Sequence, residues 1–105
     1  MRKPWTKGLG DSRKGDMAEN YALTWLWDNG YEVFMNSGST GPVDMIAMDK
    51  NGEVLKIDVK SESWSTKRNK FVNKAQRTDL QKKLGVRFIT YNPVTRKLRF
   101  VEHID

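Results

Sequence analysis

The first periodic stretch of apolar residues predicts a helix from Asp16 to Asn29. Apolar side chains recur there every three or four positions, which places them on one helix face, and Asn29-Gly30 is typical of a helix end. Residues 31–36 are rich in strand formers, and the Ser/Gly-rich residues 37–42 indicate a loop. The apolar helix positions are Met17, Ala18, Tyr21, Ala22, Trp25 and Leu26.

Residues 43–48 and 54–60 predict two strands, and the intervening Asp49-Lys50-Asn51-Gly52 favours an antiparallel hairpin. A second helix, stopped by Gly85, and two final strands complete the pattern: residues 73–84, 86–91 and 98–102. The order α-β-β-β-α-β-β predicts an α/β (α+β) fold with a central mixed sheet flanked by helices. With 105 residues and 37% hydrophobic content, we expect one domain spanning residues 1–105.

The composition limits the kinds of protein and of cellular compartment that we expect for this chain. The absence of cysteine excludes a disulfide framework and a Cys-ligated zinc site. The N-terminal residues lack the apolar stretch of a signal peptide, and no apolar run approaches the ~20 residues of a membrane span. We therefore expect a soluble, cytoplasmic protein without a membrane partner, whose first ~12 residues form a flexible basic arm.

The net charge of +6 is unevenly distributed. Residues 1–14 carry five Lys/Arg and one acid, residues 15–60 carry three and eight, and residues 61–85 carry seven and two. Basic flanks favour a polyanionic partner, but concentrated carboxylates would repel its phosphates. A divalent cation held by the carboxylates would remove that conflict.

Alternation along residues 54–60 places Leu55, Ile57 and Val59 on an apolar face and Lys56, Asp58 and Lys60 on the other. The register of the hairpin decides whether Asp44 joins Asp58. A three-residue loop with Gly52 in the left-handed conformation sets Asp44 opposite Asp58, whereas a two-residue turn pairs Asp44 with Val59 and turns its side chain away.

Two opposed carboxylates on a half-buried sheet repel each other unless a cation lies between them. Oxygen ligands without cysteine favour Mg²⁺, with Mn²⁺ as a substitute, and Lys60 can stabilise charge at a phosphate. The alternative interpretation is a solvated charged strip on an exposed strand, with Asp44 at a strand entry.

The run Gly41-Pro42-Val43-Asp44, a hairpin, and Ile57-Asp58-Val59-Lys60 resembles the PD-(D/E)XK nuclease signature. Residues 14–63 are similar to the Holliday junction resolvases of archaeal type. Two departures are Val43 between the proline and the acid, and Asp rather than Glu as the second acid. The resemblance implies a restriction-endonuclease-like core with Asp44, Asp58 and Lys60 as catalytic residues.

The same resemblance implies a helical acid at Glu19, as a metal ligand beside Asp44 and Asp58, and a helical glutamine at Gln76. Each has a structural alternative, because Asp16-Met17-Ala18-Glu19 also matches a capping box and Asn73-Lys74-Ala75-Gln76 also matches a capping pair. Both side chains are expected on the inward edge of their helices.

Residues expected to contact DNA are Lys14, Ser37, Ser39, Thr40, Lys67, Arg68, Lys70, Lys74 and Arg77. The leading hypothesis is an Mg²⁺-dependent DNA endonuclease that selects branched DNA and acts as a homodimer, since a two-fold dimer matches a symmetric junction. Two alternatives remain open. One is a homing-type or nicking endonuclease on the same core, and the other is a non-catalytic DNA-binding module.

Overall fold

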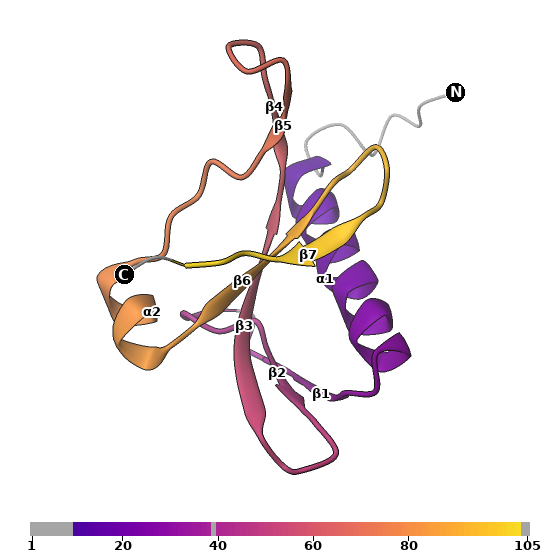
Figure 1. The fold of residues 1–105 in the computed structure, drawn as a ribbon, viewed down its shortest axis with the longest axis vertical. Coiled ribbons are helices and arrows are strands. Elements are labelled where there is room, and N and C mark those ends of the chain that lie inside the picture. Colours follow the sequence, from indigo (N-terminus) through magenta and orange to yellow (C-terminus); the bar gives the residue numbers. More distant parts are fainter. Residues whose placement is uncertain (1–9, 39, 104–105) are drawn as a thin grey trace.

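The computed structural model describes residues 10–38 and 40–103 (Figure 1). Its elements follow the predicted order with one addition, a short β4–β5 hairpin between the third strand and the second helix. The elements are α1 (Gly10–Asp28), β1 (Glu32–Met35), β2 (Met45–Met48), β3 (Val54–Ser61), β4 (Ser63–Ser65), β5 (Lys70–Val72), α2 (Asp79–Leu84), β6 (Arg87–Tyr91) and β7 (Leu98–Phe100).

The central sheet has five strands in the order β1-β2-β3-β6-β7. Strands β3 and β6 are parallel, and the other neighbouring pairs are antiparallel. The parallel pair requires a crossover connection, and α2 lies within it. The predicted mixed sheet is therefore confirmed, with β3 at its centre.

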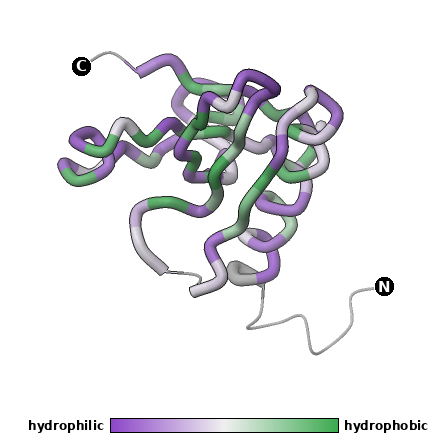
Figure 2. Tube along the Cα trace, turned by 90° about the horizontal axis from the view of Figure 1, so that it is seen from below, coloured by the Kyte–Doolittle hydropathy of each residue, from purple (hydrophilic) through white to green (hydrophobic). Residues whose placement is uncertain are grey.

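Strand β3 can contact a helix on each face because its successive side chains point to opposite faces of the sheet. The tube in Figure 2 changes repeatedly between hydrophobic and hydrophilic residues along the chain. Ile57 and Val59 are buried in the core cluster that contains Ala22 of α1. On the other face, Lys56 and Asp58 contact α2 through hydrogen bonds. Figure 1 shows α1 and α2 on opposite sides of β3 and β6.

The core forms where the apolar stripe of α1 meets the sheet. Ala18, Ala22 and Leu26, spaced four residues apart, are almost fully buried and lie on one helix face. Their counterparts on the sheet include Met45, Ala47, Ile57, Val59, Ile89 and Tyr91. The stripe is narrower than the sequence suggested, since Met17 and Tyr21 remain 36% and 39% exposed.

The start of each helix differs from the prediction. Helix α1 begins at Gly10 rather than Asp16, so residues 10–12 are not part of an arm. The rest of the predicted arm, residues 1–9, lies outside the described residues. Neither helix in the described part of the chain combines the length and hydrophobicity that crossing a membrane requires.

Helix α2 begins at Asp79 rather than Asn73 because Thr78 caps it. The Thr78 side chain accepts the Gln81 N–H and the Gln81 side chain accepts the Thr78 N–H, which forms a complete capping box. Asn73 instead accepts the Ala75 N–H in a local turn. Gly85, with φ of 73°, ends the helix as expected.

Candidate functional site

The β2–β3 hairpin adopts the register that brings the two predicted acids together. Met45 pairs with Ile57, so the next position places Asp44 opposite Asp58. In the connecting turn the Asp49 N–H donates to the Glu53 carbonyl at 2.9 Å, and Gly52 has a φ of 84°. These are the features of the three-residue loop, and the two-residue alternative is wrong.

Asp44 lies immediately before β2, where regular strand pairing stops. Its N–H donates to the Ile57 carbonyl at 2.8 Å, and its carboxylate Oδ2 accepts the Val59 N–H at 2.7 Å. The side chain thus replaces a backbone acceptor of the ladder. This bond fixes the half-buried carboxyl of Asp44 against β3.

Asp58 is only 5% exposed and has two partners for the same oxygen. The Lys60 Nζ lies 3.1 Å from Asp58 Oδ2, and the Gln81 Nε2 donates to that oxygen at 3.1 Å. The Gln81 amide also donates to the Pro42 carbonyl at 2.9 Å. Gln81 therefore joins α2, Asp58 and the loop that leads to Asp44.

Burial and the neighbouring acids alter the protonation of Asp44. Burial raises the pKa of Asp44 to about 7, and a hydrogen bond to Asp58, together with the charges of Asp58 and Glu19, acts in the same direction. The Val59 N–H opposes this by stabilising the ionised form. A site that disfavours the second negative charge is one where a divalent cation would be stabilised.

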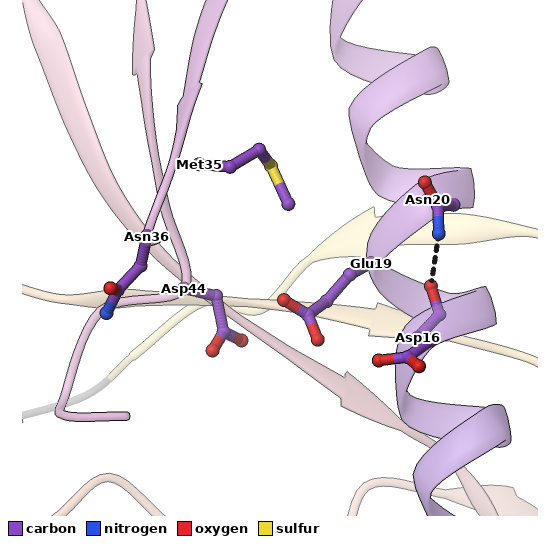
Figure 3. A pocket seen from close by; sticks show the side chains of 6 residues that line it. All are labelled: Asp16, Glu19, Asn20, Met35, Asn36 and Asp44. Atoms are coloured by element: carbon purple, nitrogen blue, oxygen red, sulfur yellow. Dashed lines mark hydrogen bonds between the residues drawn. The ribbon is translucent and has the colours of Figure 1, made fainter. Parts of the chain in front are cut away.

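Glu19 faces this pair from α1. A hollow of about 360 Å³ is lined by Asp16, Glu19 and Asn20 of α1 and by Met35, Asn36 and Asp44 from the sheet side. Figure 3 shows the Glu19 side chain extending from the helix toward Asp44. Burial, followed by the charges of Asp16 and Asp58, raises the pKa of Glu19.

The capping-box interpretation of Glu19 is wrong. The helix begins six residues before Asp16, so Asp16 lies within it and cannot be its N-cap. The Asp16 carbonyl instead accepts the Asn20 side-chain amide at 2.9 Å, one turn along the helix. Glu19 is left with its carboxyl directed into the hollow.

A second hollow, of about 440 Å³, lies on the α2 side of the sheet and includes Asp58, Lys60, Gln76 and Gln81 in its lining. Asp44 lines the first hollow and Asp58 the second. Since the two carboxyls are close enough to share a hydrogen bond, each hollow contains one carboxyl of the same pair. A phosphate placed here would have Lys60 as its neighbouring cation.

The helical glutamine that contacts Asp58 is Gln81. The prediction that Gln76 lies on this helix is wrong. Gln76 is exposed and precedes α2, although it borders the second hollow. Leu80 and Leu84, which follow Gln76 at intervals of four residues, are 52% and 36% exposed, and Gln81 is the buried residue of α2. The motif Thr78-Asp79-Leu80-Gln81 is a capping-box signal that could have located this helix start.

Sequence reasoning also missed Asn36. Its side-chain amide donates to the carbonyls of Thr40 and Val43 at 2.7 and 2.9 Å, and its Oδ1 accepts the Gly38 N–H. These bonds shape the loop that carries Pro42 and Asp44. The position of this asparagine at the start of a Ser/Gly-rich loop could have indicated that its side chain bonds to the loop backbone.

The oxygen ligands of Asp44 and Asp58 suit an ion such as Mg²⁺, which needs only one or two protein carboxylates. Among the described residues, no group of three or more His, Asp or Glu side chains is arranged to hold an ion. Mg²⁺ is commonly bound by one or two carboxylates, with waters and substrate phosphates completing its shell. Asp44 and Asp58 can provide those two carboxylates, and Glu19 lies in the adjoining hollow.

The described residues among the predicted DNA contacts fall into four places. Lys14 is exposed on α1, and Ser37 and Thr40 are exposed in the loop before Asp44, while Ser39 lies outside the described residues. Lys67, Arg68 and Lys70 belong to the β4–β5 hairpin. Lys74 and Arg77 lie between β5 and α2. The Lys74 Nζ donates to the Trp64 carbonyl at 3.3 Å, and the half-buried Arg77 donates to the Val86 carbonyl at 3.1 Å.

No protein-family model and no curated protein matches this sequence. Among solved structures, the chain is similar to a bacterial homing endonuclease, I-Ssp6803I, with 25% sequence identity and a TM-score of 0.67. The similarity covers 84% of this chain and 62% of the other. The chain thus spans less than two thirds of that protein's length.

Proposed function

We propose that this chain is a divalent-metal-dependent DNA endonuclease with a PD-(D/E)XK active site. The observation that carries the proposal is the cluster of Asp44, Asp58 and Lys60, in which two carboxyls meet and a lysine lies 3.1 Å from one of them. The similarity to a homing endonuclease supports the nuclease assignment. The acidic centre between basic flanks supports DNA as the partner.

Each residue has a separate task in this proposal. Asp44 and Asp58 hold Mg²⁺ or Mn²⁺, and Glu19 assists from the adjoining hollow. When bound, the metal polarises the phosphodiester and lowers the pKa of the attacking water. Lys60 stabilises charge that develops on the phosphate, and Gln81 holds Asp58 in orientation.

Two DNA substrates remain candidates. The resemblance of residues 14–63 to Holliday junction resolvases favours branched DNA, which a homodimer with two-fold symmetry would match. The similarity to I-Ssp6803I favours duplex DNA, as in the homing-type or nicking alternative. Trp27, 58% exposed on α1, is a candidate contact for a homodimer.

Cleavage assays with four-way junction, duplex, flap and single-stranded DNA test this function. We expect cutting with Mg²⁺ or Mn²⁺ and none with a chelator. Preferential binding of junctions in Ca²⁺ would select the resolvase-like substrate, and efficient duplex cleavage without that preference would select the homing-type or nicking substrate. If DNA binds but is never cut and Mg²⁺ does not bind, the chain is a non-catalytic DNA-binding module.

A further inference from the structure

The β4–β5 hairpin stands apart from the central sheet. Its strands form a two-stranded sheet of their own, with Trp64 paired to Phe71 and Ser65 to Lys70. Figure 1 shows this hairpin projecting from one end of the molecule, opposite the end that carries the β2–β3 turn. An extension of this kind adds little to the core, so its role is to be sought at its surface.

The hairpin is built as a firm extension of the strand that carries the active-site residues. Glu62 alone separates β3 from β4, and its N–H donates to the Tyr91 carbonyl at 2.8 Å. The Trp64 and Phe71 rings meet edge to face with centroids 5.3 Å apart. Lys74 donates to the Trp64 carbonyl, which links β4 to the segment that follows the hairpin.

The tip is basic, and a local hydrogen bond shapes its turn. Residues 66–70 contain Lys67, Arg68 and Lys70, all exposed, and no acid. The Arg68 N–H donates to the Ser65 Oγ at 3.2 Å, and Asn69 adopts a left-handed φ of 53°, so the turn has a defined shape. The turn at the other end of the molecule, residues 49–53, contains one lysine and two acids and makes a contrasting surface.

We propose that the β4–β5 hairpin enters the major groove of duplex DNA and reads base edges there. The inference rests on the proposed nuclease function and specifies a duplex arm as part of its substrate. The major groove admits a two-stranded β-ribbon, whereas the minor groove is about half as wide. Arg68 can bond the O6 and N7 acceptors of guanine in that groove, and Lys67 and Lys70 can neutralise the flanking phosphates.

The direct connection between β3 and β4 sets the distance from the active-site residues to the tip of the hairpin. Lys67 lies seven positions after Lys60, and β4 continues nearly in the direction of β3 (Figure 1). At about 3.3 Å per residue, the tip lies roughly 20 Å from the active site, which is a little over half a turn of B-DNA. The contacted bases should therefore lie about half a turn from the cut phosphate.

The first test measures duplex affinity in Ca²⁺ for the whole chain, by fluorescence anisotropy over a range of salt concentrations. The double variant Lys67→Ala/Arg68→Ala should bind at least tenfold more weakly, with a salt slope smaller by about two units. Lys50→Ala, an exposed lysine in the opposite turn, is the matched control and should bind as the wild type does. Equal losses in both variants, or no duplex binding by the wild type, would overturn the inference.

The second test asks which groove is read. Replacing guanine by 7-deazaguanine removes the N7 acceptor in the major groove, and replacing it by inosine removes the amino group in the minor groove. We expect interference from 7-deazaguanine about half a turn from the cleavage site, and its disappearance in Arg68→Ala. Sensitivity to inosine alone, or to neither base, would show that the hairpin does not read the major groove.

These readouts separate the two proposals. Duplex binding that depends on the tip, without cleavage in Mg²⁺, would reject the nuclease and keep the groove-reading hairpin. Cleavage in Mg²⁺ at the same sites and with the same affinity in the tip variant would keep the nuclease and reject the hairpin's role. Thermal melting of each variant checks that the fold is retained, which is expected because the substituted side chains are exposed.

Discussion

Gln81 donates a hydrogen bond to the Asp58 carboxylate at 3.1 Å although the two residues lie 23 positions apart in the chain. The same amide nitrogen holds the Pro42 carbonyl, two residues before Asp44. The short helix α2 therefore supports both acids of the candidate site from one side, while Glu19 faces Asp44 from α1.

This relationship makes Gln81 a positioning residue for Asp58. Gln81→Ala removes both the capping box and the bond to Asp58, whereas Thr78→Ala removes the cap and leaves Gln81 able to reach Asp58. We expect each change to cost about 1 kcal/mol of stability. Only Gln81→Ala should lower kcat and weaken Mg²⁺ binding, by about tenfold. Equal turnover in the two variants would restrict Gln81 to a capping role.

The paired acids should be essential for chemistry and dispensable for DNA binding. Asp44→Asn and Asp58→Asn should each abolish Mg²⁺-dependent cleavage, because each removes a metal ligand. Affinity for DNA in chelator, where no metal is bound, should stay level or rise, since loss of negative charge cannot weaken attraction to phosphate. Single-turnover cleavage and anisotropy measure the two effects. Retained cleavage in one variant would remove that residue from the site.

Lys60 should act on the rate more than on binding. Loss of one electrostatic stabiliser of the transition state typically costs about 10² in rate or more, and we expect that for Lys60→Ala. Lys56→Ala is the control, because Lys56 lies on the same strand face but donates to the Leu84 carbonyl. It should retain cleavage. Comparable rate losses in both variants would point to a general effect of charge on β3.

Glu19 should contribute to turnover rather than to folding. Glu19→Gln keeps the size of the side chain and removes the carboxylate that faces Asp44, so we expect kcat to fall by roughly tenfold or more. Thermal stability should not fall, because burial already disfavours the ionised form of Glu19. Asp28→Asn, at the far end of the same helix, should leave turnover unchanged. An active but destabilised Glu19 variant would contradict the site role.

The raised pKa of Asp44 predicts a pH dependence in the metal-free protein. Between its ordinary value of 3.8 and about 7, the folded chain keeps a proton that the unfolded chain has lost. The stability contributed by Asp44 therefore falls as pH rises through that window and is lost above about 7. Melting curves in chelator should show this slope, and Asp44→Asn should reduce it. Mg²⁺ should raise the melting temperature above neutral pH and have little effect in acid, where protons compete for the carboxyls.

Local rules were sufficient for the acidic hairpin. The turn chemistry of Asn51-Gly52 and the two-residue alternation around Asp58 are properties of neighbouring residues, so the register that opposes Asp44 and Asp58 followed from the sequence once a three-residue loop was chosen. The order of the main elements and the helix end at Asn29-Gly30 were predicted for the same reason.

Sequence patterns within one segment were not sufficient where the chain offers more than one possible start for a helix. Asp16 and Asn73 each resemble a helix cap, yet the helices begin at Gly10 and Asp79. The β4–β5 hairpin was missed because its strands have three residues each, too few to establish a period. Its cross-strand ring pair, Trp64 and Phe71, is visible only once the strands are paired.

The sequence by itself determined the chemical groups of the candidate site: two carboxylates opposed across a hairpin and a lysine two residues after the second of them, in a chain whose basic flanks favour a polyanion. The tertiary structure alone decided which other side chains join them. Gln81 meets Asp58 because α2 lies in the crossover between β3 and β6, and Glu19 meets Asp44 because α1 packs on the opposite face of the sheet. Such contacts depend on how distant elements pack, and the periodicity of a single segment carries no information about them.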